Sequence, residues 1–345
     1  MYFRKMNFLK IILSPFSIVY STINALRNSF FERGLLKIYK SSIKVISVGN
    51  ISMGGTGKTP HVAYIINLLK SSNTAVISRG YGRKASNLIE GDSAIHTALD
   101  LGDEPMELLS KFEGPKFKMI SEANRTKALH YLERQKTLTE FAILDDGFQH
   151  RYVDRDLNIL LSDYNNLFYN DFVVPQGTLR ESRQGVKRAD LIIITKCKPT
   201  ISELERSEIK SKISKFAQVP ICFSTINYKG FTNKNDKSIQ LNKSYLLITG
   251  IAKPQLIHQY LSSQNINFEA LTFGDHHDFS TKEIERIAKK SKLFDGIITT
   301  EKDWMRLKDT ELQNHSNREL FRLNIEVTII GEQDRIFFNK QITKL

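Results

Sequence analysis

An apolar run that leads through a glycine-rich turn into a helical pattern lies near the start of the chain. The run is Val45–Val48, the turn reads GNISMGGTGKTP over residues 49–60, and the helical pattern covers Lys58–Leu69. This order of strand, glycine loop and helix is the context that a phosphate-binding loop requires. It predicts an α/β fold with a parallel sheet, because the loop must connect the carboxyl end of a strand to a helix packed on that sheet.

The residues of the turn suit the phosphates of a nucleotide. Gly54, Gly55 and Gly57 leave room for backbone N–H groups to surround an anion, and the start of the following helix adds its dipole. Lys58 can reach the β- and γ-phosphates, and the Thr59 hydroxyl can ligate Mg²⁺. We therefore expect a nucleotide site made of Ser52, Met53, Gly54, Gly55, Thr56, Gly57, Lys58 and Thr59.

Two departures from common nucleotide-binding patterns narrow the class of protein. Ser52 stands where the pattern GxxxxGK[ST] has glycine, and the doubled glycine that follows can supply the flexibility. A GTPase would carry [NT]KxD after an apolar strand to read guanine, but Thr195–Lys198 places a lysine at the aspartate position. The letters of Asn233–Asp236 match that motif but follow no apolar strand. Guanine specificity is therefore not expected.

Short apolar runs alternate with helical patterns beyond residue 43, and a polar, turn-rich segment interrupts this alternation. We expect four parts: an N-terminal amphipathic helix in 1–40, a P-loop α/β/α domain in 41–228, a linker or β-hairpin in 229–243, and a smaller α/β/α domain in 244–345 that closes over the site. The expected strands are Ile43–Val48, Thr74–Ser78, Phe141–Leu144, Leu157–Leu161, Leu191–Thr195, Pro220–Thr225, Tyr245–Thr249, Phe268–Phe273, Gly296–Thr299 and a tail strand at Leu323–Ile330.

Adjacent carboxylates follow one of these strands. Phe141–Leu144 has the pattern of a buried strand and leads into Asp145, Asp146 and Gly147. An Asp-Gly surface turn is the simpler explanation. In a parallel sheet that also holds a phosphate loop, however, the carboxyl ends of the strands meet at one edge, so we expect both aspartates at a magnesium site.

Two further clusters can serve a kinase, which needs a group to receive the proton of the acceptor hydroxyl. Asp103 and Glu104 stand in a Gly-Asp-Glu-Pro turn at a predicted helix start, where a single carboxylate is usually a cap. His276 and His277 stand between two aspartates after an apolar strand of the second series. If the domains close on each other, His276 can orient Asp103 as a base.

Charge and cysteine content limit the partners and the environment. The chain of 345 residues carries 50 Lys and Arg against 37 Asp and Glu, a formal charge of +13, which predicts an anionic partner: nucleic acid, nucleotide phosphates or an acidic membrane surface. Two cysteines provide neither a disulfide framework nor a cysteine metal site, as expected in a reducing cytosol.

The first forty residues are basic and have a helical pattern with one polar and one apolar face. Ser14 and Pro15 predict the start of the helix, and Gly34 predicts its end. Polar residues interrupt the apolar run too often for a helix that spans a bilayer. A helix packed on its own domain and a helix lying on an anionic leaflet both fit, and we favour the leaflet.

Several segments together resemble one protein family. They are VGNISMGGTGKTP at 48–60, SRGYGRK at 78–84, GDEP at 102–105, LDDGFQH at 144–150, PQGTLRE at 175–181, DHH at 275–277 and TEKD at 300–303. The combination resembles the tetraacyldisaccharide 4′-kinases, the lipid A 4′-kinases of Gram-negative bacteria, over about residues 10–308. Ser52 is compatible with that family's own version of the loop.

The resemblance implies that ATP, with Mg²⁺, phosphorylates the 4′-hydroxyl of tetraacyldisaccharide 1-phosphate to give lipid IV A. It implies two α/β/α domains with the site in their cleft, a peripheral location on the cytoplasmic face of the bacterial inner membrane, and no nucleic-acid partner. Carried over by motif, the catalytic groups would be Asp103, its partner His276 and Lys58. The substrate contacts would be Arg79, Arg125, Arg180 and Glu181, and the metal environment would comprise Thr59, Asp145, Asp146 and Glu104.

A nucleotide-hydrolysing switch or a metallochaperone without a lipid acceptor is the alternative from another class. The missing guanine motif and the scarcity of cysteine weigh against it. Label transfer from γ-labelled ATP to the lipid would separate the two hypotheses.

Overall fold

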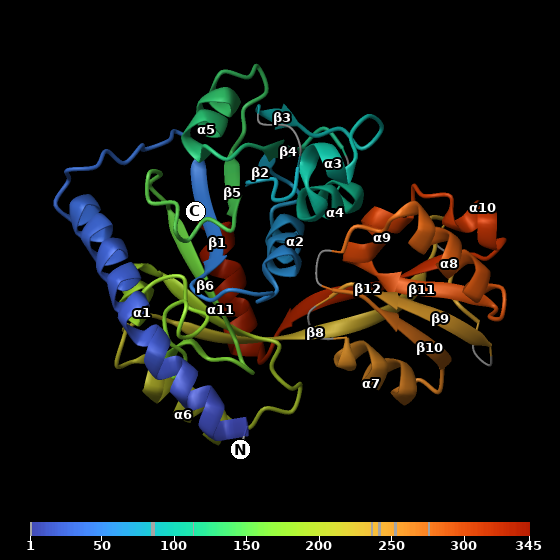
Figure 1. The fold of residues 1–345 in the computed structure, drawn as a ribbon. Helices are drawn as coiled ribbons and strands as arrows, with labels where there is room; N and C mark the ends of the chain where they lie inside the picture. Colours follow the sequence, from blue (N-terminus) through green and yellow to red (C-terminus); the bar gives the residue numbers. More distant parts are fainter. Residues whose placement is uncertain are drawn as a thin grey trace.

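The computed structural model describes the chain, with side chains from residue 11 onward, over residues 2–83, 87–112, 114–235, 237–240, 243–251, 254–274 and 277–345. The strands in these ranges are β1 (Lys44–Asn50), β2 (Thr74–Ser78), β3 (Ile89–Glu90), β4 (Phe117–Ser121), β5 (Phe141–Asp145), β6 (Leu157–Asp163), β7 (Leu191–Thr195), β8 (Ile221–Thr232), β9 (Ser244–Thr249), β10 (Asn267–Thr272), β11 (Gly296–Thr300) and β12 (Leu320–Ile329). They form one continuous sheet in the order β10-β9-β11-β12-β8-β7-β6-β1-β5-β2-β4-β3 (Figure 1).

The sheet has two parts that meet at β8 and β12. We call β1–β8 with their helices the N-terminal lobe, and β9–β12 with theirs the C-terminal lobe. Strands β8 and β12 pair antiparallel over a long stretch, whereas β1 is parallel to both of its neighbours, β5 and β6. Strand β8 extends seven residues beyond the expected end at Thr225, and β12 confirms the expected tail strand.

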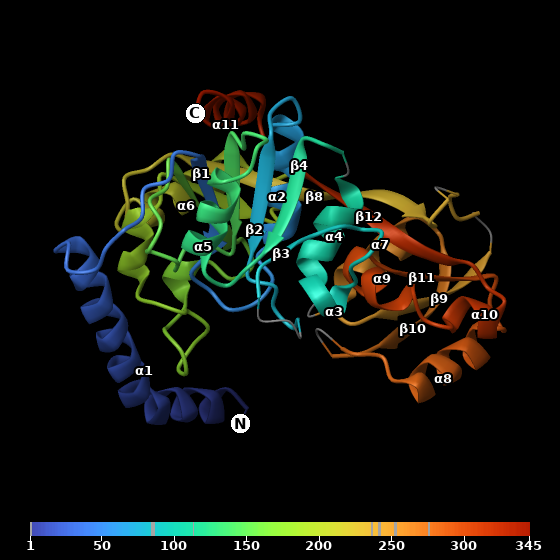
Figure 2. The same ribbon diagram turned by 90° about the horizontal axis from the view of Figure 1, so that it is seen from above.

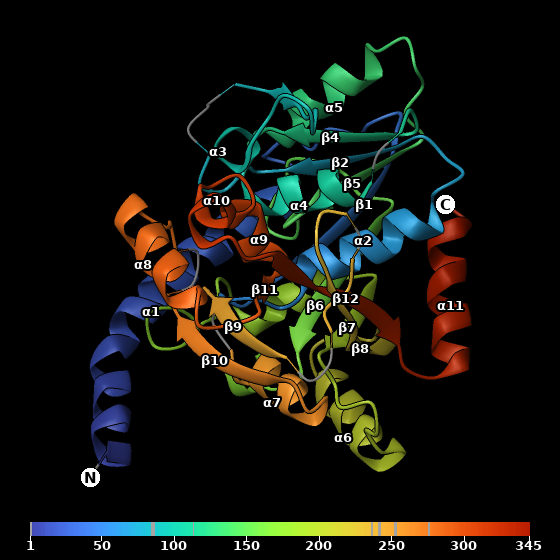
Figure 3. The same ribbon diagram turned by 90° about the vertical axis from the view of Figure 1, so that its right-hand side faces the viewer.

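Helices cover both faces of the sheet (Figures 1 and 3). The α-helices are α1 (Tyr2–Glu32), α2 (Lys58–Leu68), α3 (Ala98–Leu101), α4 (Asp103–Lys111), α5 (Arg125–Glu133), α6 (Glu203–Ile213), α7 (Gln255–Ser263), α8 (Thr281–Ser291), α9 (Glu301–Leu307), α10 (Leu312–Ser316) and α11 (Glu332–Thr343). Short 3₁₀ segments lie at Phe168–Asn170 and Arg183–Arg188.

Successive side chains of a strand point to opposite faces of the sheet and therefore pack in different layers. In β1, Ile46 packs in the core shared with α2, α4, α8, α9 and α11, whereas Val45 packs with α5 on the opposite face. The second face continues under α6 and, in the C-terminal lobe, under α7. This three-layer arrangement confirms the expected α/β fold with its P-loop in a parallel part of the sheet. The division into the four expected residue ranges stays a prediction.

The C-terminal helix returns to the N-terminal lobe after the C-terminal lobe is complete. Helix α11 lies beside α2 (Figure 3), where Tyr64 donates a hydrogen bond to Asn339 at 3.0 Å and its ring packs against Phe338. The helix that follows the glycine loop is therefore held from behind by the last element of the chain.

Helix α1 lies along the outside of the N-terminal lobe (Figure 2), and its polar side chains face that lobe. The Ser17 hydroxyl donates to the Val173 carbonyl at 3.0 Å and accepts from the Gln176 N–H at 2.9 Å. Arg151 donates to the Asn28 carbonyl at 3.0 Å. The apolar side points away from the protein, with at least 49% exposure at Ile11, Ile12, Phe16, Ile18, Val19, Ile23 and Leu26. No helix in the described part of the chain is long and apolar enough to cross a membrane.

The expected helix start at Ser14 and Pro15 is wrong, because α1 begins at Tyr2 and contains Pro15. Proline at this position cannot donate to the Ile11 carbonyl, but the Ser14 hydroxyl donates to that carbonyl at 2.8 Å and replaces the missing bond. The expected end is confirmed: the helix stops at Glu32 and Gly34 follows with φ +70°.

Candidate active site

The glycine loop joins β1 to α2 and has the backbone conformation that only glycine adopts readily. Gly54 has φ 99° and Gly57 has φ 84°, so Gly57 turns the chain in the left-handed region directly before Lys58 begins α2. The first amides of α2 therefore lie at the loop, where an anion would meet both the N–H groups and the positive end of the helix dipole.

Side chains behind the loop fix its path. Asn50 donates to the Thr56 hydroxyl at 2.9 Å, and the Thr195 hydroxyl at the end of β7 donates to the Thr56 carbonyl at 2.8 Å. His61 is buried between the Gly57 carbonyl at 2.6 Å and the Ser224 hydroxyl at 2.9 Å, and burial lowers its pKa to about 4. His61 is thus a neutral support for the loop at physiological pH.

Ser52 occupies an extended part of the loop, which explains why glycine is not needed there. It forms an antiparallel bridge with Leu179, and the Met53 N–H donates to the Thr178 carbonyl at 2.7 Å. The Arg180 N–H donates to the Ile51 carbonyl at 2.7 Å. The first arm of the loop is therefore paired with residues 178–180, which include Arg180, one of the four predicted substrate contacts.

Lys58, Asp146 and Arg180 form a charged group beside the loop. The distance from Lys58 Nζ to an Asp146 oxygen is 3.6 Å, and Arg180 contacts the other oxygen at 2.9 Å. Burial raises the pKa of Asp146, but the charges of Lys58 and Arg180 outweigh it, and the net pKa is lowered. Asp146 is therefore an anion at neutral pH beside the glycine loop, and its role at a magnesium site stays a prediction.

Asp145 lies at the end of β5 in a different environment. It is 4% exposed, and its Oδ1 atom has no hydrogen-bond partner among the described residues. Burial raises its pKa to about 7, with Asp146 and Glu104 adding to the shift and Lys58 opposing it. A buried carboxylate oxygen of this kind beside a phosphate loop fits a divalent cation, which takes one or two carboxylates together with substrate phosphates.

No group of three or more potential metal-ligating side chains lies together in the described part of the chain. The residues that fit Mg²⁺ are therefore the two aspartates and the Thr59 hydroxyl, with phosphate oxygens completing the shell. Glu104 lies close enough to Asp145 to raise its pKa, so the turn at residues 102–105 meets the same edge of the sheet.

The four predicted substrate contacts differ in their surroundings. Arg125 starts α5, is 3% exposed, and donates to the Asp145 carbonyl at 3.2 Å. Arg79 is exposed and close enough to Arg125 to lower its pKa, although burial is the larger cause of that shift. Glu181 is buried and held by Arg188 at 2.8 Å and by Gln149 at 3.1 Å, so its carboxylate supports the segment next to Arg180.

Asp103 is the first residue of α4, after Gly102 with φ 98°. Its carboxylate is paired with the guanidinium of Arg306, which comes from α9 in the C-terminal lobe. The predicted partner of Asp103, His276, lies outside the described residues. The described neighbour His277 contacts Glu283 at 3.0 Å and stacks on Phe273.

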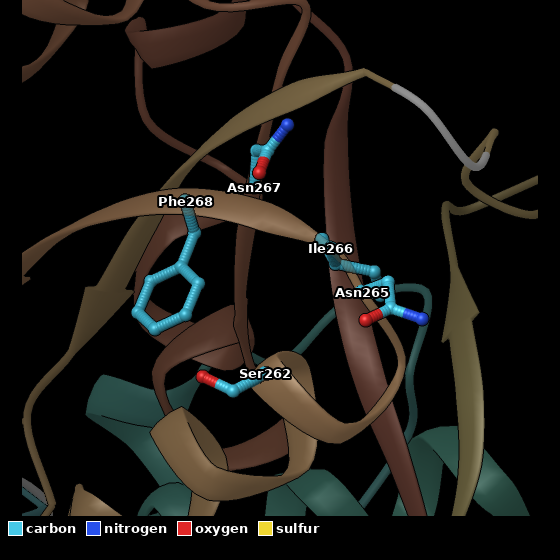
Figure 4. Close-up of a pocket in the computed structure, with 5 residues that line it drawn as sticks. All are labelled: Ser262, Asn265, Ile266, Asn267 and Phe268. Atoms are coloured by element: carbon cyan, nitrogen blue, oxygen red, sulfur yellow. The ribbon is translucent and has the colours of Figure 1, made fainter.

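A hollow of about 380 Å³ lies elsewhere, between the end of α7 and the start of β10 (Figure 4). It is lined by Ser262, Asn265, Ile266, Asn267 and Phe268. This lining has no charged side chain and includes none of the motif residues, so the hollow has no part in the chemistry of the glycine loop.

Comparison with known proteins gives one consistent result. The family model described as tetraacyldisaccharide-1-P 4′-kinase matches residues 9–343. The chain belongs to this family. It is 40% identical to a tetraacyldisaccharide 4′-kinase of Flavobacterium johnsoniae, covering 95% of each chain, and 41% identical to one of Flavobacterium psychrophilum, covering 98% of this chain and 97% of that one.

A solved structure of a family member from Aquifex aeolicus in complex with ATP has a TM-score of 0.75 and 28% sequence identity. The match covers 97% of this chain and 99% of that chain. Both lobes therefore share the fold of the 4′-kinase family, and the resemblance seen in the sequence motifs is confirmed over nearly the whole length.

Some residues that shape the 4′-kinase site gave no signal in the sequence. Arg306 follows the TEKD segment by three residues and belongs to no quoted motif. Thr195 and Lys196 belong to a sequence that lacks the aspartate of a guanine motif, yet both donate to carbonyls of the glycine loop, at Thr56 and Gly55. Gln149 stands in the LDDGFQH segment, which does not by itself indicate a role for its amide. In the structure that amide donates to the Asn50 carbonyl at 2.7 Å.

Proposed function

We propose that this chain transfers the γ-phosphate of ATP to the 4′-hydroxyl of tetraacyldisaccharide 1-phosphate, giving lipid IV A. Membership of the 4′-kinase family and the structural match to a family member in complex with ATP support the reaction and the nucleotide. The observation that carries the proposal is the meeting of Lys58, Asp145, Asp146 and the turn at 102–105 at one edge of the sheet. A phosphate donor and a proton acceptor can face each other there.

Each group has a place in the transfer. Lys58 and the amides at the start of α2 hold the β- and γ-phosphates. The Asp103 carboxylate takes the proton of the 4′-hydroxyl while that oxygen bonds to the γ-phosphorus, and the bond to the bridging oxygen breaks to release ADP. His276 orients Asp103. Bound Mg²⁺, held by Thr59 and the aspartates, would neutralise charge on the transferred phosphate.

The arginines supply the remaining positive charge. Arg180 is held by Asp146, and Arg125 is fixed against the carbonyl at the end of β5. With Arg79, they surround the edge where the acceptor sugar would enter. Phosphoryl transfer depends mostly on positioning and charge stabilisation, and fixed guanidinium groups provide both.

The outward apolar side of α1 supports a location on the cytoplasmic face of the inner membrane. An acceptor with four acyl chains cannot leave the bilayer cheaply, since each exposed CH₂ costs about 0.8 kcal/mol. Helix α1 presents isoleucines and phenylalanine outward at the lobe that holds the glycine loop, and exposed Arg33 and Lys37 follow it. Such a surface binds anionic lipid peripherally.

The test is label transfer from γ-labelled ATP to tetraacyldisaccharide 1-phosphate, with Lys58→Ala as the inactive control. Label in the lipid supports the kinase. Label that appears only as free phosphate would instead support a nucleotide-hydrolysing switch.

A further inference from the structure

Arg306 connects the two lobes at the residue that serves as the base in the proposed reaction. Its Nε lies 3.1 Å from one Asp103 oxygen, and its Nη2 contacts the other oxygen. The remaining nitrogen, Nη1, donates to the His277 carbonyl at 2.9 Å. One planar guanidinium therefore contacts both the start of α4 and the backbone next to His276.

This ion pair differs from the exposed pairs elsewhere on the molecule. The side chains of Arg306 and Asp103 are 9% and 14% exposed, whereas Lys229 and Glu326 form a pair with 55% and 54% exposure. Exposed pairs contribute little, because water and salt screen them. A buried pair with a two-point geometry fixes the direction of the carboxylate as well as its charge.

The location of the pair argues for a role in the reaction. Asp103 belongs to the N-terminal lobe and Arg306 to α9. The first turn of α9 is held within the C-terminal lobe because the Asp303 carboxylate accepts from the Gly250 N–H at 2.8 Å. Helices α4 and α9 pack directly against each other. A movement of either lobe would therefore move the guanidinium relative to the carboxylate.

We infer that Arg306 is the positioning residue that fixes Asp103 and the residue 277 backbone in one arrangement for proton transfer. The inference rests on the proposed function, in which Asp103 is the base. Arginine is always protonated, so its two N–H donors hold both Asp103 oxygens in one plane before the acceptor arrives. The proton still goes to Asp103, and Arg306 neither gives nor takes one.

The experiment compares Arg306→Met and Arg306→Lys with the unchanged chain, using acceptor dispersed in detergent so that membrane binding has no influence. We expect kcat to fall about 10²-fold in Arg306→Met, the lower end of the range for positioned proton transfer, with KM for ATP changed less than threefold. Arg306→Lys should be intermediate, because lysine keeps the charge but loses the two-point geometry.

Arg318→Met is the matched control, since Arg318 lies in the same lobe and donates to the Lys292 carbonyl at 3.0 Å, away from Asp103. Its kcat should be unchanged. The single tryptophan, Trp304, lies two residues before Arg306 and is 3% exposed, so an unshifted fluorescence maximum reports that α9 is still packed.

A double-variant cycle with Asp103→Asn separates positioning from folding. If Arg306 acts through Asp103, Arg306→Met should cost at most threefold in the Asp103→Asn background. An equal loss in both backgrounds, a kcat within threefold of the unchanged chain in Arg306→Met, or a faster Arg306→Met would each overturn the inference. Normal turnover by Asp103→Asn would instead show that the proposed base is wrong.

Discussion

The glycine loop and helix α1 are built in opposite ways. At the loop, charged groups are drawn into the protein: Asp145 is 4% exposed and Arg125 is 3% exposed. At α1, apolar groups are left outside, and Ile18 and Ile23 are 65% and 63% exposed. Each arrangement is costly in an isolated protein, because buried charges lose hydration and exposed apolar surface orders water.

The glycine loop and helix α1 correspond to two tasks that a kinase acting on a membrane lipid must perform. The loop region must stabilise charge on a transferred phosphate, and this does not depend on how the lipid is presented. In the proposed function, helix α1 brings the site to the bilayer, and this contribution depends on whether the lipid acceptor lies in a membrane. Variants in the two regions should therefore differ in whether detergent restores activity.

Lys58→Ala should have the largest effect. Removing the cation that meets the γ-phosphate should lower kcat by at least about 10³-fold, equally with acceptor in vesicles and in detergent. The measurement is label transfer from γ-labelled ATP. Lys70→Ala, at an exposed lysine just past the other end of α2, is the control and should retain full turnover. Activity that returned in detergent would mean that Lys58 acts in membrane binding, as proposed for the apolar side of α1, and not in phosphoryl transfer.

If Asp145 ligates Mg²⁺ as proposed, Asp145→Asn should lower kcat about 10²-fold. In the absence of nucleotide and metal, the same substitution should stabilise the fold. Burial raises the pKa of Asp145 from 3.8 to about 7. Between these values the folded state binds more protons than the unfolded chain, so its stability falls as pH rises through this window. The amide lacks that dependence.

The melting temperature of Asp145→Asn, measured in EDTA, should therefore exceed that of the unchanged chain at pH 8 and match it near pH 4. A gain that is constant with pH would show that the carboxylate does not titrate there. The same gain persisting in saturating MgATP would show that the ligands do not use the carboxylate.

The sequence predicted the loop region well because its chemistry is local. The strand, the glycine loop and Lys58 follow one another within a short stretch of the sequence. Asp145 ends an apolar strand, and the carboxyl ends of neighbouring parallel strands meet at one predictable edge of the sheet. Arg306 was not predictable, because it reaches Asp103 across 203 residues through the packing of α4 against α9. For α1 the pattern established two faces, but it is the side-chain bonds of Ser17 and Asn24 to the lobe that reveal that the polar face is inside.

The double substitution Ile18→Asp and Ile23→Asp tests whether the outward apolar side of α1 binds the membrane. Each isoleucine that enters a bilayer contributes about 1.5–3 kcal/mol, so with both replaced the activity on vesicle-bound acceptor should fall at least about 10²-fold. Activity on detergent-dispersed acceptor should be unchanged. Leu293→Asp, at an 80% exposed leucine of the C-terminal lobe, is the control and should affect neither assay. Equal losses in both assays would mean that the apolar side of α1 supports folding.

Arg33→Gln combined with Lys37→Gln should give the smallest effect and the one most sensitive to salt. Both side chains are exposed just beyond α1, and a basic residue near an anionic leaflet contributes about 1 kcal/mol that ions screen. Affinity for vesicles with anionic lipid, measured by cosedimentation, should fall up to about thirtyfold at low salt, and the difference should vanish at about 1 M salt, where the Debye length is only 3 Å. Binding to neutral vesicles should be unchanged, because the isoleucines of α1 remain. A loss of affinity that remains at high salt would contradict an electrostatic contribution of Arg33 and Lys37. Membrane binding would then rest on the apolar side of α1 alone.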